Sequence, residues 1–342
     1  MGMYFSTFIS GIQEFIPGVL RKNIRDVKIT RLLDGAILYQ TSANIESIKN
    51  IRFFNNSFEV IKTFEDPRDI DDMIKECIED RSIGNEISAT IGKSNQGKTF
   101  RIITSKENRL ISADKKFIDK LESKIMRNGV QVDRSGPDIE FWFLQRRENI
   151  GIFMMRLTKH RAYEKVLQKG ELRPEISSIM CLLSEPGRAD IVIDPFCGYG
   201  SIIIERSKIP HHKIIGIDSD RKKIFDLKRK TKGKGIEIYP SNSLDLSRIK
   251  SDSIDKIITD PPWGIYEKIN SKEFYERMLK EFLRVLRPGG ICVILTSQKE
   301  LTPELAKKLK IKIEGRFDIL VSGKKAALFK MRKPQTKDLR VN

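Results

Sequence analysis

The apolar and polar positions of this chain follow one rhythm up to about residue 160 and a different one from about residue 185. In the first part, short runs rich in β-branched and aromatic residues predict strands over 27–32, 35–42 and 57–64. Apolar residues at helical spacing predict a helix over 113–129, which Gly129 ends. This mixture predicts one or two small α+β units upstream of residue 160.

Three further upstream elements follow from the same patterns. An amphipathic pattern over 10–24 predicts a helix. A second helix is expected over 66–83, with its Asp-Pro pair as the start signal. Apolar runs over 139–144 and 150–157 flank a polar turn, and this arrangement predicts a hairpin.

From about residue 185, strand-like and helix-like runs alternate. Strands are expected over 189–198, 212–220, 236–242, 253–264 and 291–297. Helical patterns between them cover 200–209, 221–231 and 271–290. Such alternation predicts an α/β fold with a parallel sheet and right-handed crossovers, and the apolar strands suit burial on both faces.

The charge of the chain adds information about partners. The net charge is +18 and the pI is about 9.6. Such an excess favours a polyanionic partner, because each Lys or Arg that docks on a phosphate releases counterions. The alternative is a lysine-rich, solvated surface. No apolar run is long enough to span a bilayer, so no membrane association is expected.

The cysteine and histidine positions argue against a metal site. The four cysteines lie far apart with no C-x-x-C pair, and the three histidines add no metal-ligand spacing. Reduced thiols, a cytoplasmic location and no bound metal are therefore expected. The sequence does not fix the oligomeric state, and a monomer is the working expectation.

One motif suggests a nucleotide-binding loop and fails on its context. Residues 92–99, "GKSNQGKT", satisfy the pattern G-x-x-x-x-G-K-[ST]. That loop needs a helix after it, whose N-terminus points at phosphate. A strand-like run, "TFRIITS", follows here. We expect a basic hairpin turn between two strands rather than an NTPase site.

The strand ends of the second part carry a different set of polar residues. Asp194 ends the first strand of the alternating part and is followed by Gly198 and Gly200. Glycines let a backbone turn sharply and approach a ligand. Asp218 ends the next strand, where an acid suits a ribose diol. Since a third glycine is missing, the pattern favours S-adenosylmethionine over a dinucleotide. The alternative is a pair of ordinary βα turns.

The stretch "TDPPWG" ends a later strand on the same expected edge. Asp260 would offer a carboxylate, and Pro261 and Pro262 would leave neighbouring carbonyls uncommitted to a ladder. Two such acceptors suit an exocyclic NH2 group, which they would position for attack on a sulfonium methyl group. Trp263 offers a face for stacking a base. The alternative is a core tryptophan and a turn-capping aspartate.

Together these residues resemble the amino-methyltransferases with an (N/D)-P-P-(Y/F/W) motif, and more closely the THUMP-domain RNA guanine-N2 methyltransferases. The matching stretches are 170–180, 194–205 and 259–264. Upstream, 4–20 is similar to the family's ferredoxin-like unit, and 100–133 with the following two strands is similar to its THUMP domain.

The resemblance implies an arrangement of domains. It implies a ferredoxin-like domain over 1–60, a THUMP domain over 61–160, a linker with a helix over 161–185, and a Rossmann-like methyltransferase domain over 186–335. It also implies that S-adenosylmethionine is the cofactor, that the upstream units dock tRNA, and that the N2 amine of a guanosine is methylated.

The resemblance also implies roles for individual residues. The catalytic and stacking set is Asp260, Pro261, Pro262 and Trp263. The cofactor set is Asp194, Phe196, Cys197, Gly198, Gly200, Asp218, Ser219, Asn242, Ser243 and Asp260. The substrate-pocket set is Arg173, Pro174, Glu175 and Gly264.

Two departures keep alternatives open. Asn242 stands where the family usually has an acid near the adenine amine, and Trp263 stands where many relatives have Tyr or Phe. The stretch D-P-P-W also occurs in RNA adenine-N6 methyltransferases, so an adenine-N6 methyltransferase acting on RNA or DNA is one alternative. A catalytically dead RNA-binding module is the other.

Overall fold

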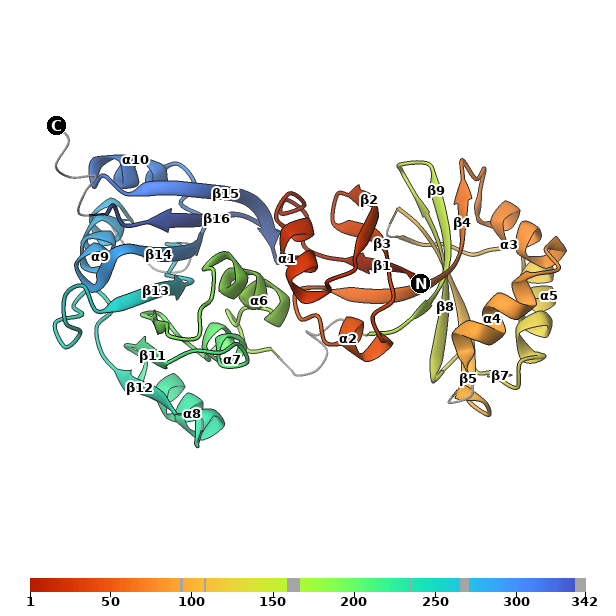
Figure 1. The fold of residues 1–342 in the computed structure, drawn as a ribbon, viewed down its shortest axis with the longest axis horizontal. Helices are drawn as coiled ribbons and strands as arrows, with labels where there is room; N and C mark the ends of the chain where they lie inside the picture. Colours follow the sequence, from red (N-terminus) through yellow and green to blue (C-terminus); the bar gives the residue numbers. More distant parts are fainter. Residues whose placement is uncertain (93–94, 108, 159–166, 234, 265–270, 336–342) are drawn as a thin grey trace. The chain divides into compact units, whose positions relative to one another are not determined.

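The computed structural model of the protein describes residues 1–92, 95–107, 109–158, 167–233, 235–264 and 271–335. The chain forms two compact units (Figure 1). One contains Met1–Phe8 and Leu20–His160, and the other contains Ile9–Val19 and Arg161–Asn342. Residues 9–19 belong to the second unit, where the Phe15 ring lies 6.1 Å from the ring of Phe317.

Within the described residues, the first unit contains a sheet of nine strands with the order β2-β3-β1-β4-β9-β8-β5-β6, and β7 beside β5. Strand β5 runs parallel to β7 and β8, and the other neighbours are antiparallel. The strands are β1 (Gly2–Thr7), β2 (Lys28–Leu33), β3 (Ala36–Thr41), β4 (Asn56–Glu65), β5 (Thr99–Lys106), β6 (Arg109–Leu110), β7 (Gln131–Val132), β8 (Ile139–Arg146) and β9 (Ile150–Arg156). The helices are α2 (Ile45–Lys49), α3 (Ile70–Glu79), α4 (Ile83–Ile91) and α5 (Lys115–Met126), while α1 (Ile16–Asn23) spans the boundary between the units.

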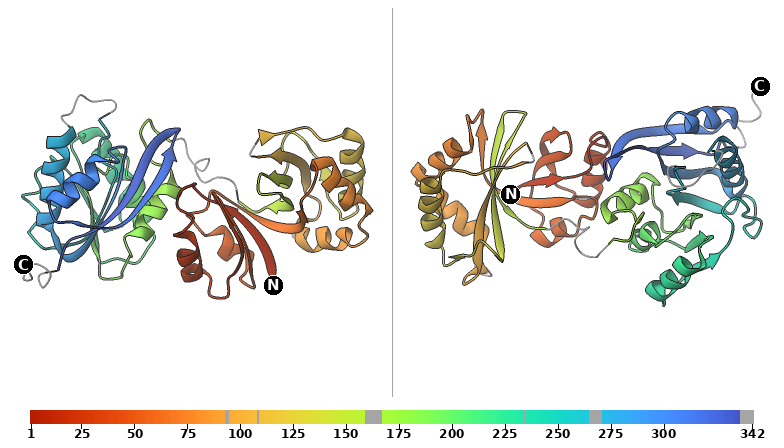
Figure 2. Two further views of the ribbon diagram at one scale, coloured as in Figure 1. Left: turned by 90° about the horizontal axis from the view of Figure 1, so that it is seen from above. Right: turned by 180° about the vertical axis from the view of Figure 1, so that it is seen from behind.

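Helices α3, α4 and α5 cover one side of strands β4, β5, β8 and β9 (Figures 1 and 2). Helix α3 buries Ile70, Met73, Ile74 and Cys77, which share one helical face. Its N-cap is Asp69, whose carboxylate accepts a hydrogen bond from the Asp72 amide. The expected start at the earlier Asp-Pro pair is therefore wrong by a few residues.

Strand β4 runs through the expected domain boundary at residue 60. Its residue Phe58 pairs with Phe5 of β1 on one side and with Arg156 of β9 on the other. A buried cluster likewise joins Phe5 and Phe58 to Leu144 and Met154. The division of the chain at residues 60, 160 and 185 stays a prediction. The expected hairpin is confirmed as the antiparallel pair β8–β9.

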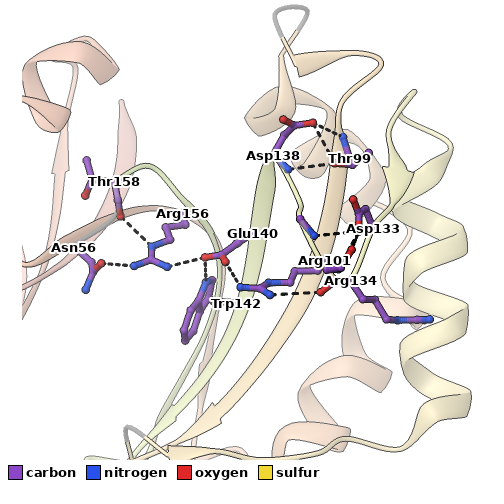
Figure 3. Close-up of polar contacts among 12 residues, drawn as sticks. Asn56, Thr99, Arg101, Asp133, Arg134, Asp138, Glu140, Trp142, Arg156 and Thr158 are labelled. Carbon is purple, nitrogen blue, oxygen red and sulfur yellow. Dashed lines mark hydrogen bonds and ion pairs between the residues drawn. The ribbon is translucent and has the colours of Figure 1, made fainter. Parts of the chain in front are cut away.

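A buried carboxylate ties β5, β8 and β9 together (Figure 3). Glu140 of β8 is 8% exposed and accepts hydrogen bonds from Arg101 of β5 and Arg156 of β9. The Trp142 indole donates to the same carboxylate at 3.3 Å. Burial alone would raise the pKa of Glu140, but the hydrogen bonds from Arg156 and Arg101 outweigh it and hold the pKa below its ordinary value.

The second unit contains a seven-stranded sheet with the order β12-β11-β10-β13-β14-β16-β15 among the described residues. The strands are β10 (Ile191–Asp194), β11 (Lys213–Asp218), β12 (Ile236–Pro240), β13 (Ile254–Thr259), β14 (Leu286–Thr296), β15 (Lys312–Val321) and β16 (Lys324–Arg332). The helices are α6 (Pro174–Leu183), α7 (Ser201–Arg206), α8 (Arg221–Thr231), α9 (Ser271–Val285) and α10 (Leu301–Lys308).

Helices cover both faces of this sheet (Figures 1 and 2). Helix α9 buries Tyr275, Met278, Leu279, Phe282 and Val285 at helical spacing against the strands. All six residues of β13 are buried, as expected for a central strand of a doubly wound sheet. The α/β fold expected from the alternating pattern is thus confirmed.

The sheet differs from the expectation of parallel strands throughout. Strands β10 to β14 are parallel, but β16 is antiparallel to both β14 and β15. The cause is the β15–β16 hairpin, in which Val321 pairs with Lys324. The two turn residues between them, Ser322 and Gly323, have φ of 50° and 79°, and two positive φ values match the twist of a tight hairpin.

The motif at 92–99, of which residues 93 and 94 lie outside the described residues, follows a helix and leads into a strand. Helix α4 ends at Ile91 with Gly92 as its C-cap, and β5 begins at Thr99. The expected turn between two strands is therefore wrong, while the expected strand after the loop is confirmed. Because a strand follows, the loop has no helix N-terminus to offer a phosphate. No helix in the described part of the chain has the length and apolar character needed to cross a membrane.

Candidate active site

Three aspartates follow three neighbouring parallel strands. Strands β11, β10 and β13 lie side by side, and Asp218, Asp194 and Asp260 stand at their carboxyl ends. The carboxyl edge of an open parallel sheet is where such folds bind ligands. The topology therefore brings together the acids that the sequence placed on one edge.

The loop after β10 is held in a tight glycine turn. The Cys197 amide donates to the Ile217 carbonyl at 2.8 Å, and the Gly200 amide donates to the Cys197 carbonyl at 2.7 Å. Gly200 has a φ of 88°, and a Cβ there would lie 2.1 Å from Leu227 Cδ1. Only glycine fits this position, because a larger residue would meet both backbone strain and a clash.

Asp218 fastens this loop to the end of β11. Its Oδ2 accepts a hydrogen bond from the Gly198 amide at 2.8 Å, and its Oδ1 accepts one from the Asp220 amide at 2.9 Å. The residue remains partly exposed. A carboxylate has lone pairs for more than two donors, so Asp218 can hold the loop and still face a diol.

Asp194 is the most deeply buried of the three acids, at 1% exposure. Its Oδ1 accepts hydrogen bonds from the Thr259 hydroxyl at 2.8 Å and from the Phe196 amide at 3.2 Å. Burial is the main cause that raises the pKa of Asp194 to about 8. The hydrogen bonds from Thr259 and the Phe196 amide oppose this rise, and the smaller effects of the Asp218 and Asp260 charges add to it.

Asp260 and Trp263 contact one another across the proline pair. The Trp263 Nε1 donates to Asp260 Oδ1 at 2.8 Å. Asp260 is partly exposed to solvent, but the groups around its carboxyl exclude most water. This loss of hydration raises the pKa of Asp260 to about 7, against the opposing effect of the Trp263 hydrogen bond.

The carbonyls of the turn are more engaged than the sequence suggested. The Pro262 carbonyl accepts a hydrogen bond from the Tyr275 hydroxyl at 3.1 Å. The Trp263 carbonyl accepts from Gln298 Nε2 at 3.0 Å and from the Ser297 hydroxyl at 3.3 Å. The expectation that the carbonyls beside the prolines are uncommitted is therefore wrong for these two, because α9 and the residues just after β14 supply donors.

A cavity lies between the glycine loop and the end of β13. Five of the residues predicted from the sequence line it: Asp194, Phe196, Cys197, Gly198 and Asp260. The glycine loop and the Asp-Pro-Pro-Trp turn thus meet at one cavity through Asp260. The other five predicted cofactor residues, Gly200, Asp218, Ser219, Asn242 and Ser243, are not among the described residues that line it.

The outlying cofactor residues have local partners. Ser219 is exposed, and Asn242 is exposed with its Oδ1 accepting from the Leu244 amide at 3.0 Å. The buried Ser243 hydroxyl donates to the Pro195 carbonyl. The Asn242 side chain therefore stabilises the turn in which it lies.

The predicted substrate-pocket residues lie at the start of α6 and after the proline pair. Arg173 is the N-cap of α6, Pro174 is its first residue, and Glu175 is 1% exposed in its first turn. Gly264 has a φ of 74° directly after Trp263. None of the four lines the cavity among the described residues.

Sequence reasoning missed several residues of this site. Glu171, Tyr199, Ser201 and Lys223 also line the cavity. Tyr199 and Ser201 flank Gly200, Tyr199 in its loop and Ser201 as the first residue of α7, so their place beside the glycine motif was a signal in the sequence. Thr259 precedes Asp260 and anchors Asp194, whereas Tyr275 lies mid-helix and only the packed structure identifies it.

The part of the chain that the structure describes contains no group of three or more His, Cys, Asp or Glu side chains placed to hold a metal ion. All four cysteines are buried free thiols.

Most of the second unit is similar to known methyltransferase domains. Residues 161–325 match the family described as RMKL-like, methyltransferase domain. U6 snRNA (guanine-N(2))-methyltransferase THUMPD2 of Bos taurus is 34% identical over 143 residues, which are 40% of this chain and 27% of that protein. A tRNA (guanine(10)-N2)-dimethyltransferase of Methanothermobacter thermautotrophicus is 28% identical over 151 residues, 42% of this chain and 44% of its own.

A solved structure matches nearly the whole chain. The crystal structure of TrmN from Thermus thermophilus covers 97% of this chain and 100% of its own, with a TM-score of 0.77 at 18% identity. At this identity the likeness establishes the fold alone. The matched segment spans less than half the length of the two curated relatives.

Proposed function

From the match of residues 161–325 to the RMKL-like methyltransferase domain, we propose that this protein moves a methyl group from S-adenosylmethionine to the exocyclic N2 amine of a guanosine in tRNA. The observation that carries the proposal is the shared cavity, in which the glycine loop and Asp260 face one another. The names of the curated relatives, which include guanine-N2 methyltransferases of tRNA and of U6 snRNA, support guanine as the target.

The cavity fits the proposed cofactor by the shape of its backbone. The loop from Cys197 to Gly200 turns back under Asp218, and a Cβ at Gly200 would collide with Leu227. Such a turn leaves room for a ligand close to the main chain. When bound, S-adenosylmethionine would supply a methyl group on a positively charged sulfur. Asp194, Phe196, Cys197, Gly198 and Gly200 would hold it, with Asp218 at its ribose.

Asp260 would act on the amine. Its carboxylate accepts one N–H of the exocyclic group, which orients the nitrogen lone pair toward the methyl carbon. With a pKa of about 7, the same carboxylate is ionised over the upper part of the neutral range and can take the proton that the methylated nitrogen releases. A paired guanosine would have to be flipped out of its helix to reach it.

The Asp-Pro-Pro-Trp turn would be held rigid by its neighbours. Tyr275 fixes the Pro262 carbonyl, and Gln298 fixes the Trp263 carbonyl. A fixed turn lowers the cost of arranging the acceptor and the stacking face at each reaction. Trp263 would stack on the target base, where a single aromatic contact typically contributes about 1–3 kcal/mol.

A tRNA substrate fits the positive charge of the chain and a cytoplasmic site of action. The expected monomer and the expected role of the upstream residues in docking tRNA stay predictions. The two alternatives are weaker. The curated relatives described above are guanine-N2 enzymes, and a dead binding module would not need the acid at the cavity.

The direct test is methyl transfer by Asp260→Ala. Purified wild-type protein is mixed with labelled S-adenosylmethionine and unmodified tRNA transcripts, and transfer is followed in a single turnover. The variant should lose at least a hundredfold in rate while its tRNA affinity changes less than twofold, because the carboxylate acts on the reacting amine. A variant that transfers methyl groups at the wild-type rate would exclude the role given to Asp260.

A further inference from the structure

The positive charge of this protein is concentrated in its second unit. Residues 1–160 carry 26 Lys and Arg against 22 Asp and Glu, whereas residues 161–342 carry 38 against 24. The upstream residues therefore account for little of the excess. The main electrostatic attraction for a polyanion comes from the methyltransferase unit itself.

Much of that excess lies on one helix. Residues 221–232, which contain α8, carry seven Lys and Arg and one acid, Asp226. Ile224, Leu227 and Thr231 face inward and are buried. Arg221, Lys222, Lys228 and Arg229 are exposed on the outer face. In the described part of the chain, Lys222, Lys228 and Arg229 form no ion pair, whereas Lys223 pairs with Asp220.

An exposed aromatic ring lies in the middle of this face. Phe225 is 62% exposed. It stands one helical turn from Arg221 and Lys222 on one side and from Lys228 and Arg229 on the other. A phenylalanine side chain that stays in water adds no burial energy to the stability of the folded protein. A ring surrounded by cations matches the way nucleic-acid-binding proteins combine stacking with phosphate contacts.

This face adjoins the proposed active site through Tyr199. The Lys223 and Lys230 amines lie 5.5 and 5.9 Å from the centre of the Tyr199 ring. Tyr199 lines the cavity that holds Asp260, and it also lines an open hollow with Lys222, Arg229 and Lys230. Tyr199 therefore links the cavity to the cations of α8, and a strand of RNA that leaves the cavity past Tyr199 would meet Lys222, Arg229 and Lys230.

We infer that the outer face of α8, formed by Arg221, Lys222, Phe225, Lys228 and Arg229, binds RNA next to the modified nucleotide. The cations contact backbone phosphates, and Phe225 stacks on an unpaired base. This inference rests on the proposed tRNA substrate and names a surface through which the methyltransferase unit holds it.

A membrane surface is the other polyanion to consider, and the helix does not suit it. A helix that lies in a bilayer interface turns a broad apolar face to the lipid. The apolar residues of α8 are buried in the unit, and Phe225 alone is outside. The outer face of α8 carries one aromatic side chain among charged residues and has no apolar stripe.

The test compares two triple variants with equal loss of charge. The α8 variant is Lys222→Ala, Lys228→Ala and Arg229→Ala. The control variant is Lys307→Ala, Lys312→Ala and Lys325→Ala, three exposed lysines on α10, β15 and β16. These belong to the β15 edge of the sheet, opposite the β12 edge beside which α8 lies. Binding of unmodified tRNA transcripts is measured from 50 to about 300 mM salt, together with cofactor affinity.

The α8 variant should bind tRNA at least tenfold more weakly at about 100 mM salt, and its slope of log affinity against log salt should be shallower by about 2. Its cofactor affinity should not change. The control variant should stay within about twofold of the wild type. Phe225→Ala should weaken binding about tenfold with no change in the salt slope, since stacking releases no counterions.

Equal losses in the α8 and control variants would overturn the inference, because general charge would then explain the binding. Binding to phosphatidylserine vesicles that depends on α8 while tRNA binding does not would also overturn it. Failure of the proposed function has a separate signature. The wild-type protein would bind tRNA through α8 but transfer no methyl group to it.

Discussion

Asp260 is the proposed acceptor and base for the reacting amine, and its surroundings determine how far it is ionised near neutral pH. Removal from water raises its pKa to about 7, so the carboxyl is about half ionised there. The ionised carboxylate is the stronger acceptor for an amine N–H, and only this form can take up the proton that the methylated nitrogen releases. The activity of the free enzyme should therefore depend on pH in a range where most aspartates do not titrate.

The first prediction concerns that pH dependence. In the wild-type protein, kcat/KM should rise with pH through a midpoint near 7, because this quantity reports the free enzyme and the protonated Asp260 cannot take up the proton from the methylated amine. Asp260→Asn should lower kcat/KM and remove the limb, since an amide oxygen accepts at every pH. The measurement is initial methyl transfer between pH 5.5 and 8.5. A wild-type profile without a limb in this range would contradict the role of Asp260.

Elements rather than single residues hold the Asp-Pro-Pro-Trp turn in place. Helix α9 contributes Tyr275, whose hydroxyl reaches the Pro262 carbonyl and lies 2.7 Å from the Thr296 hydroxyl. The end of β14 and the residues after it complete this support. Tyr275 touches no predicted ligand, so it acts through the turn and is a positioning residue.

The second prediction tests that support. Tyr275→Phe should lower kcat about tenfold while KM for tRNA and cofactor affinity stay within twofold, because the lost hydrogen bond loosens the turn and leaves the binding surfaces intact. Tyr239→Phe is the matched control. Tyr239 lies in the edge strand β12, away from the residues that support the turn, so this substitution should leave kcat unchanged. An equal effect of the two substitutions on kcat would show that Tyr275 serves stability alone.

The third prediction concerns the first unit. Glu140→Gln leaves Arg101 and Arg156 without a carboxylate and should cost about 2 kcal/mol of unfolding free energy at pH 7. The folded-state pKa of Glu140 is lowered, so its contribution is present above the unfolded pKa and is lost as the pH falls through the folded pKa. The difference between variant and wild type should therefore shrink below about pH 4.

Urea unfolding of both proteins at pH 7 and at about pH 3 provides the measurement. Glu65→Gln is the control, because the Glu65 side chain is 68% exposed and its ion pair with Arg31 should contribute less than about 1 kcal/mol. A cost for Glu140→Gln as small as that of the control would contradict the importance of the network.

The sequence predicted those elements whose local pattern and final burial agree. The alternating half from β10 to β14 and the hairpin β8–β9 are such elements, and so is α5. Helix α4 was missed because three Ile together with a Gly, an Asn, a Ser and a Thr make up most of its nine residues, and these residue types have modest or low helix propensity. Burial of Ile83, Ile87 and Ile91 on one face stabilises it, and that depends on tertiary packing.

The candidate site divides in the same way. Asp194, Gly198 and Asp260 were found because their residue types at strand ends carry chemical meaning on their own. Tyr275 and Lys223 have no such signal in the sequence, because only the folded structure brings Tyr275 to the turn and Lys223 to the cavity. The comparisons support the resemblance to guanine-N2 methyltransferases that those motifs suggested. The roles given to the individual residues stay predictions.

At the scale of the whole molecule, the chain does not divide cleanly at residue 160. Residues 9–19 belong to the second unit, and a Cβ at Gly11 would collide with the Asp318 carbonyl oxygen. A truncation that removes residues 1–160 would therefore damage the second unit as well. Substitutions on the surface of the full chain separate RNA binding from catalysis more cleanly.

The central claim is that this protein methylates the N2 amine of guanosine in tRNA. The most direct measurement is nucleoside mass spectrometry of unmodified tRNA transcripts after incubation with the 342-residue protein and methyl-labelled S-adenosylmethionine. We expect label in N2-methylguanosine or N2,N2-dimethylguanosine, and none after Asp260→Ala. Label in N6-methyladenosine, or no label in any nucleoside, would contradict the claim.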